Sequence, residues 1–188
     1  MGNFYTNVVV RSSDADRAVK VLESQKRTAY VASVDEMTFV YDEKCEDQNV
    51  KDLMALARLL SKGTGAPALA ALNHDDDVLW LALAEGDSVT NIYNSYPAFS
   101  DEGSDEPMVR DIARLCAAFG VPERAAEVET LLAASHEEVL FEIGRHEKLL
   151  ELLEVSAIGL TGYNYVYEDG LPEEGVAIRA TGGAPLPS

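Results

Sequence analysis

The five residues Asn73–Asp77 place an imidazole and three carboxylates in one short segment. Hard divalent cations prefer oxygen ligands, so His74, Asp75 and Asp77 are candidate ligands of a metal that would activate a hydrolytic water. In an extended segment, however, Asp75 and Asp77 share one face while His74 lies on the other. Asn and Asp are also favoured in turns, and the same segment then predicts a hairpin turn between two apolar strands. We favour the turn and keep the metal site as the alternative.

A second acidic cluster lies earlier in the chain, where Asp42, Glu43, Glu46 and Asp47 precede a predicted helix. Carboxylates at such a position stabilise the positive N-terminal end of the helix, which is an ordinary structural role. In the sheet predicted below, the loops after the third and the fourth strand lie at the same end. Asp42 and Glu43 are therefore further candidate metal ligands beside the Asn73–Asp77 segment.

A histidine and two cysteines call for structural rather than catalytic interpretations. His146 shares an apolar helical stripe with Ile143 and Leu150, which predicts a buried imidazole that is hydrogen-bonded to a neighbouring glutamate or to a strand. Cys45 and Cys116 form neither a disulfide framework nor a zinc spacing, and this favours a reducing cytoplasm. Cys116 follows an apolar helical pattern and is predicted to be an unreactive core thiol.

Two tyrosines near Pro97 are candidates for contact with a protein partner. Tyr93 and Tyr96 lie close together in the sequence, and tyrosine is enriched at protein interfaces. Three more tyrosines alternate in residues 163–167, a pattern that predicts a short strand packed against the helical part of the chain.

The chain has a formal net charge of −18, from 33 Asp and Glu residues against 15 Lys and Arg. This excess opposes binding to nucleic acid and to anionic membrane surfaces, both of which attract basic patches. No run of apolar residues approaches the length of a membrane span. With 47% hydrophobic residues, the sequence has the material for a folded core. We expect a cytoplasmic protein whose partner is itself a protein, with a basic protein as a candidate.

The elements that must position these residues follow one another in the order β-α-β-β-α-β. They are a strand at 4–10, a helix at 14–25, strands at 28–33 and 37–42, a helix from Asn49 that ends at Gly63, and a strand at 67–72. This order predicts a ferredoxin-like core. The apolar run 78–83 and the run 89–93, separated by a turn at Gly86, extend it by a hairpin. The predicted fold class is α+β, with about six mainly antiparallel strands in the order second, third, first, fourth, fifth and sixth.

The domain organisation follows from a change of character after Pro97. Residues 1–97 form the predicted sheet domain, and residues 98–179 form a helical extension packed on the sheet, with helices at 107–119, 122–134 and 136–155 and a short strand. Together they make one compact domain. Residues 180–188, rich in Gly and Pro, are predicted to be a disordered tail.

Three segments carry a resemblance to a known family. The opening Met1-Gly2-Asn3-Phe4-Tyr5-Thr6-Asn7, the segment Asn73-His74-Asp75-Asp76-Asp77-Val78-Leu79-Trp80 and the run Thr161-Gly162-Tyr163 resemble a family of uncharacterised bacterial proteins. The resemblance spans residues 1 to about 170 and implies no activity and no catalytic residue. In charge and size the chain is also similar to the small acidic α+β immunity proteins of bacterial toxin systems.

These observations favour a non-catalytic protein that binds a protein partner, as an inhibitor, an immunity-like protein or a regulator, without a cofactor. The alternative is a metal-dependent hydrolase that uses His74, Asp75 and Asp77. The sequence does not identify the partner or the oligomeric state.

Overall fold

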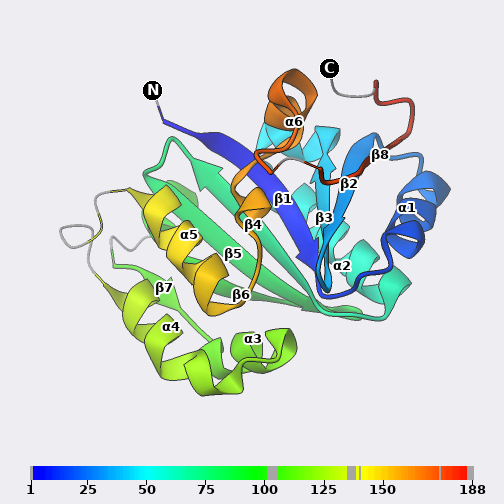
Figure 1. The fold of residues 1–188 in the computed structure, drawn as a ribbon. Helices are drawn as coiled ribbons and strands as arrows, with labels where there is room; N and C mark the ends of the chain where they lie inside the picture. The colour runs from blue at the N-terminus through cyan, green and yellow to red at the C-terminus, as the bar shows by residue number, and fades with distance from the viewer. Residues whose placement is uncertain (1, 101–105, 135–138, 140, 174, 186–188) are drawn as a thin grey trace.

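The chain folds into three layers, with one antiparallel sheet between two groups of helices (Figure 1). The computed structural model describes residues 2–100, 106–134, 139, 141–173 and 175–185. Within them the sheet has eight strands in the order β7-β6-β5-β4-β1-β3-β2-β8, and every neighbouring pair is antiparallel. The predicted α+β class with a mainly antiparallel sheet is confirmed.

The first six elements follow the predicted order. They are β1 (Phe4–Val10), α1 (Ala15–Ser24), β2 (Ala29–Val34), β3 (Met37–Asp42), α2 (Val50–Thr64) and β4 (Ala68–His74). Local capping sets the helix starts, since the Asp14 side chain accepts a hydrogen bond from the backbone N–H of Arg17 (3.0 Å) before α1. Asn49 caps α2 in the same way, with Oδ1 3.0 Å from the backbone nitrogen of Lys51.

Helix α2 ends one half-turn later than the sequence predicts. The left-handed C-cap is Gly65, with φ of 76°, and not Gly63. Gly63 lies inside the helix, where a Cβ would overlap with the side chain of Val21 on α1. The glycine at this position therefore serves the close packing of α1 against α2.

The next two strands, β5 (Val78–Glu85) and β6 (Ser88–Asn94), form the predicted hairpin, with Gly86 in its turn at φ of 61°. β5 is buried along almost its whole length because helices cover both faces of the sheet there. The pairing of β5 with β6 shifts register between Leu81 and Ala82, which marks a β-bulge.

The sheet has eight strands rather than about six, because each edge carries one short strand more. β7 (Met108–Val109) pairs with β6, and β8 (Ile178–Thr181) pairs with β2. Both are too short to show an alternating pattern in the sequence. The predicted disordered tail is wrong for Ala180 and Thr181, because the free edge of β2 supplies backbone partners for them. Residues 186–188 lie outside the described part of the chain.

The predicted strand at 163–167 is wrong, since these residues belong to helix α6 (Tyr163–Asp169). Tyr163 and Val166, one helical turn apart, are both buried on the sheet. The N-terminus of the helix is held by a carboxylate from a distant segment, that of Glu46, which accepts a hydrogen bond from the backbone N–H of Tyr163 (3.0 Å). Tertiary contacts thus override the local alternation of tyrosines.

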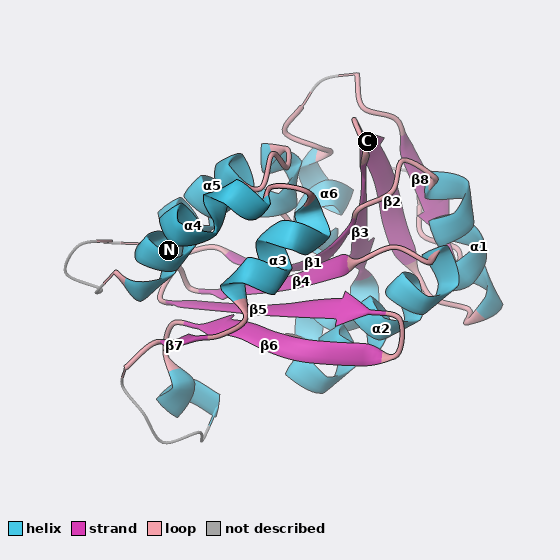
Figure 2. Cartoon of the chain, turned by 90° about the horizontal axis from the view of Figure 1, so that it is seen from below, coloured by secondary structure: helices cyan, strands magenta, loops and turns pink. Residues whose placement is uncertain are grey.

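The two faces of the sheet carry separate hydrophobic cores. Helices α1 and α2 cover one face, over Val8, Val31, Val40 and Trp80. The other face packs under α3 (Ile112–Phe119), α4 (Ala125–Ala133), α5 (Glu142–Leu152) and α6, as Figure 2 shows. The helical portion therefore packs on the sheet as expected. The helix predicted from 136 begins at Glu142, and residues 135–138 lie outside the described part.

Among the residues that the structure describes, no helix has the length and apolar character needed to cross a bilayer. Cys45 and Cys116 are both free and buried. Burial raises the pKa of each thiol, so that neither forms a thiolate readily.

Candidate functional site

The segment Asn73–Asp77 is a hairpin turn, as we favoured. β4 ends at His74 and β5 begins at Val78. Asp75 and Asp76 have φ of 54° and 60°, and the backbone N–H of Asp77 donates to the carbonyl oxygen of His74 (3.0 Å). Asp and Asn tolerate these left-handed conformations better than most residues do, which explains why aspartates occupy the turn.

The carboxylates of the turn hold the segment that leads into β1. The backbone N–H of Gly2 donates to Oδ1 of Asp75 (3.0 Å). Asp76 accepts from both the backbone N–H and the side-chain amide of Asn3 (3.1 and 3.0 Å), and from the side-chain amide of Asn73 (2.9 Å). Gly2 lies so close to the turn that a Cβ there would overlap with the carbonyl oxygen of Asp75. These aspartates thus have a structural role.

Asp42, a candidate metal ligand, is committed to an ion pair. Its carboxylate is buried and binds Arg27 through two hydrogen bonds of 2.6 Å. This hydrogen-bonded carboxylate raises the pKa of the Arg27 guanidinium, because it stabilises the charged form. β1 lies between β3, which ends at Asp42, and β4, which ends at His74.

The other candidate metal ligands lie on the surface. Glu43 is exposed at the start of a 3₁₀ helix, η1 (Glu43–Asp47), and Asp75 and Asp77 are exposed at the hairpin turn. Within the described residues, no three His, Cys, Asp or Glu side chains are grouped so that they could hold a metal ion. The ends of β3 and β4 place the two acidic clusters at the same end of the sheet, as predicted. The clusters lie on separate elements there.

His74 faces a pocket and is fixed by a glutamine. Its Nδ1 lies 2.5 Å from Oε1 of Gln48, whose Nε2 donates to the carbonyl oxygen of Asn73 (2.8 Å). This second bond turns the amide oxygen towards the ring, so Nδ1 carries the proton and donates it. The ring of Phe4 meets the imidazole edge-on, with centroids 4.9 Å apart.

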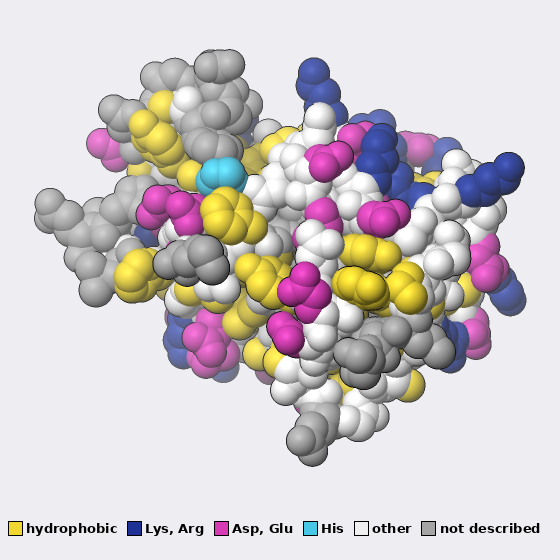
Figure 3. Space-filling view, turned by 90° about the horizontal axis from the view of Figure 1, so that it is seen from above, with side chains coloured by type: hydrophobic (Ala, Val, Ile, Leu, Met, Phe, Trp, Pro, Cys, Tyr) yellow, Lys and Arg dark blue, Asp and Glu magenta, His cyan; other side chains and the backbone are white. Residues whose placement is uncertain are grey.

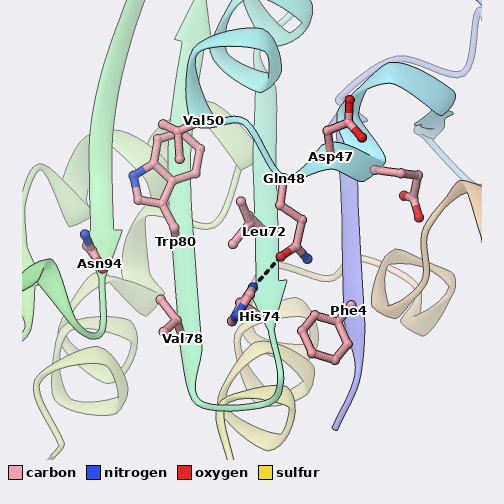
Figure 4. Close-up of a pocket in the computed structure, with 10 residues that line it drawn as sticks. Phe4, Asp47, Gln48, Val50, Leu72, His74, Val78, Trp80 and Asn94 are labelled. Carbon is pink, nitrogen blue, oxygen red and sulfur yellow. Dashed lines mark hydrogen bonds between the residues drawn. The ribbon is translucent and has the colours of Figure 1, made fainter. Parts of the chain in front are cut away.

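The pocket has a volume of about 450 Å³ and lies on the sheet face that α1 and α2 cover, at the end where α2 begins (Figure 4). Val50 and Trp80 overlap in this view, and Phe4 and His74 lie near each other at one end of the pocket. Most of the lining surface is apolar, although half of the ten lining residues are polar or charged. The lining residues are Phe4, Glu46, Asp47, Gln48, Val50, Leu72, His74, Val78, Trp80 and Asn94.

Glu46 joins one wall of this pocket to helix α6. Its carboxylate accepts hydrogen bonds from the backbone N–H groups of Tyr163 (3.0 Å) and Asn164 (3.5 Å). Burial raises the pKa of Glu46, and these hydrogen bonds oppose that shift. These hydrogen bonds therefore connect this wall of the pocket to the start of α6.

The two candidate partner-binding tyrosines have different environments. Tyr93 is fully buried, with Arg145 5.7 Å from its ring centroid, so the prediction that it contacts a partner is wrong. The bulge leaves Ile92 of β6 as an extra residue opposite Leu81 and Ala82, and this changes the alternation of β6, so that both Ile92 and Tyr93 are buried. Tyr96 is 39% exposed and stays a candidate.

His146 has the buried position that the sequence predicts. Its Nδ1 lies 2.9 Å from the hydroxyl of Tyr5 on β1, and the two rings stack with centroids 5.9 Å apart. Burial lowers the pKa of His146 to about 3, so the imidazole is neutral. The hydrogen-bond partner is thus a strand residue, which was one of the two partners expected.

Sequence reasoning missed Phe4, Gln48 and Trp80 as members of one site. The single tryptophan of the chain was a usable signal, because it lies in a strand beside the turn. The position of Gln48 had no such signal, since its left-handed conformation, with φ of 55°, depends on how η1 meets α2.

Comparison with protein-family models, with curated proteins and with solved structures gives no match. The resemblance to a bacterial family therefore stays a prediction.

Proposed function

We propose that this protein is a non-catalytic binding protein that holds a protein partner at the pocket beside Phe4, acting as an inhibitor, an immunity-like protein or a regulator. One observation carries the proposal. The pocket is open and walled by aromatic side chains. Two of its titratable lining residues, His74 and Glu46, are fixed in internal hydrogen bonds, and the third, Asp47, is exposed at the rim. Such an arrangement suits recognition by shape more than proton transfer.

Exposed aromatic side chains support a protein as the partner. Phe4 is 40% exposed and Tyr96 is 39% exposed, and large aromatic residues are enriched at interfaces. Figure 3 shows hydrophobic side chains beside the one histidine in view, with Asp and Glu side chains interspersed. The net charge of −18 favours a protein over a nucleic acid as the partner and, with two free cysteines, supports a cytoplasmic location.

We also propose that the core has the ferredoxin-like βαββαβ arrangement. The order β4-β1-β3-β2, with α1 and α2 on one face of these strands, supports it. The pocket lies at the end of the sheet where α2 begins, between the first residue of this helix and the strands β4 and β5.

Site-specific photocrosslinking tests the proposal. A photoreactive benzoylphenylalanine replaces Phe4 in the full chain, expressed in its source cells, and irradiation should give one discrete protein adduct. The same group in place of Tyr167, which is 47% exposed on α6, is the matched control and should give none. If both positions gave the same adducts, or neither gave any, the pocket would not be a partner site.

The metal-dependent hydrolase has no specific observation in its favour, because Asp42 is paired with Arg27, and Asp75 holds Gly2. Titration calorimetry with Mg²⁺, Mn²⁺, Ca²⁺ and Zn²⁺ distinguishes it from the proposed function. Binding of one of these cations with a dissociation constant below about 10 μM, lost in Asp75→Ala, would favour the hydrolase.

A further inference from the structure

We infer that the segment of the partner that enters the pocket is an aromatic side chain flanked by Lys or Arg, an inference that rests on the proposed function. The pocket of about 450 Å³ lies in the lower part of the range of about 300–1,000 Å³ typical of ligand sites. Such a volume suits one large side chain together with its neighbours, and not a folded surface laid flat.

The aromatic character of the occupant follows from the walls. The Phe4 ring stands edge-on to His74, at 84° between the ring planes, and 40% of Phe4 remains accessible. The hydrogen bond to Gln48 fixes the imidazole, so this aromatic pair is already positioned before anything binds. A third ring can pack against the accessible part of Phe4 in an edge-to-face or offset geometry, with Trp80 as a further wall.

The basic flanks follow from the charges at the rim. The described lining residues include Glu46 and Asp47 and no Lys or Arg. Asp47 is exposed, and the exposed carboxylates of Asp75 and Asp77 stand on the turn that links two lining strands. Glu46 is already bonded to the backbone of α6 and Asp75 to the backbone of Gly2, so Asp47 and Asp77 are the groups that meet a cation.

The lysines nearest to the lining segment in the sequence lie outside the pocket lining. Lys44 and Lys51 flank the lining segment 46–50 in the sequence, and neither lines the pocket. The ammonium group of Lys44 lies 2.7 Å from Oδ1 of Asp52 and is paired there. A partner with Lys or Arg beside its aromatic residue would thus meet an acidic rim and be steered towards it by the net charge of −18.

The single tryptophan provides the measurement. Trp80 lines the pocket and is the only tryptophan of the chain, so its fluorescence reports occupation of the pocket. The probes are the capped tripeptides Lys-Phe-Lys, Glu-Phe-Glu and Lys-Ser-Lys, which contain no tryptophan. We expect Lys-Phe-Lys to change the emission saturably and to bind at least tenfold more tightly than either of the others. Its advantage over Glu-Phe-Glu should shrink in 0.5 M salt.

Two variants of the full chain, each checked for an unchanged thermal transition, complete the test. Phe4→Ala should weaken Lys-Phe-Lys at least tenfold, while Tyr167→Ala on α6 should leave it unchanged. Asp47→Lys should reduce the preference for Lys-Phe-Lys over Glu-Phe-Glu and leave the two closer in affinity. Because Asp47 is exposed, this variant retains its fold, and it keeps the test valid if Phe4→Ala is unstable.

The outcomes separate this inference from the proposed function. Equal binding of Lys-Phe-Lys and Glu-Phe-Glu, or binding of Lys-Phe-Lys that Phe4→Ala does not weaken, would overturn the occupant inferred here. A photoadduct at position 4 together with no binding of Lys-Phe-Lys would overturn the occupant and leave the partner site in place. Peptide binding without any photoadduct would instead contradict the proposed function.

Discussion

The hydroxyl of Tyr5 lies 2.9 Å from Nδ1 of His146, and this contact joins the first strand of the sheet to helix α5. Both side chains are about 1% exposed, so the hydrogen bond is shielded from water. Burial raises the pKa of the Tyr5 hydroxyl and lowers that of the imidazole to about 3, which keeps both groups neutral. A histidine that would look catalytic from its residue type alone is thus a packed partner of a strand tyrosine.

Replacement of His146 by Ala should lower the free energy of unfolding by roughly 1–3 kcal/mol, because it removes a buried hydrogen bond and leaves a partial cavity. Chemical denaturation followed by circular dichroism measures this loss. Crosslinking from position 4 should survive wherever the fold survives. A variant with an unchanged melting temperature and no partner binding would show that α5 lines a functional site.

The depressed pKa of His146 should also make stability depend on pH. The folded state takes up this proton only near pH 3, whereas the unfolded state takes it up near 6.5, so the unfolded state binds more protons between these values. The contribution is present in full above pH 6.5 and is lost as pH falls towards 3, at about 1.4 kcal/mol per pH unit at most. His146→Gln removes the titrating group. The free energy of unfolding of the wild type minus that of the variant should therefore decrease as pH is lowered from 6.5 to 4. A constant difference would contradict the depressed pKa of His146.

The order of the strands was predictable because its signals are local. Apolar runs, the caps Asp14 and Asn49 and the turn at Gly86 stand beside the elements that they begin or end. Strands with such short connections pair with their neighbours, and this placed the hairpin β5-β6 beside β4.

The parts that were mispredicted depend on distant residues. Helix α6 is capped by Glu46, which is 117 positions away from Tyr163 in the chain, and β8 forms on an edge that β2 supplies. The same applies to the candidate site. His74 was identified from its own segment, whereas Gln48 and Phe4 reach it from other elements. The burial of Tyr93 depends on a bulge that the residue types of β6 do not predict.

Arg145 should be one of the most sensitive residues of the fold. It is fully buried, binds the Glu142 carboxylate at 3.0 Å and donates to the carbonyl oxygen of Ala134 (3.0 Å) at the end of α4. Arg145→Met leaves a buried carboxylate without its cation and should cost about 3–5 kcal/mol in urea denaturation. The double variant with Glu142→Leu should recover roughly 1 kcal/mol or more of this loss. A double variant as unstable as the sum of the two single variants would show that the ions do not interact.

Asp76 should prove the essential carboxylate of the hairpin turn. It accepts hydrogen bonds from Asn3 and Asn73, and its φ of 60° disfavours alanine. Asp76→Ala should therefore lower the free energy of unfolding by about 2–3 kcal/mol, while Asp76→Asn, which tolerates the same φ and keeps one acceptor, should cost less than half as much.

Asp77→Ala is the matched control, because Asp77 is exposed in the same turn and its loss should change stability by no more than about 0.5 kcal/mol. Thermal and urea unfolding of the three variants measure these differences, and hydrogen exchange at the Asn3 amide should accelerate in Asp76→Ala. If Asp76→Ala and Asp77→Ala were equally mild, the turn would not hold the start of β1, and its aspartates would need a functional explanation.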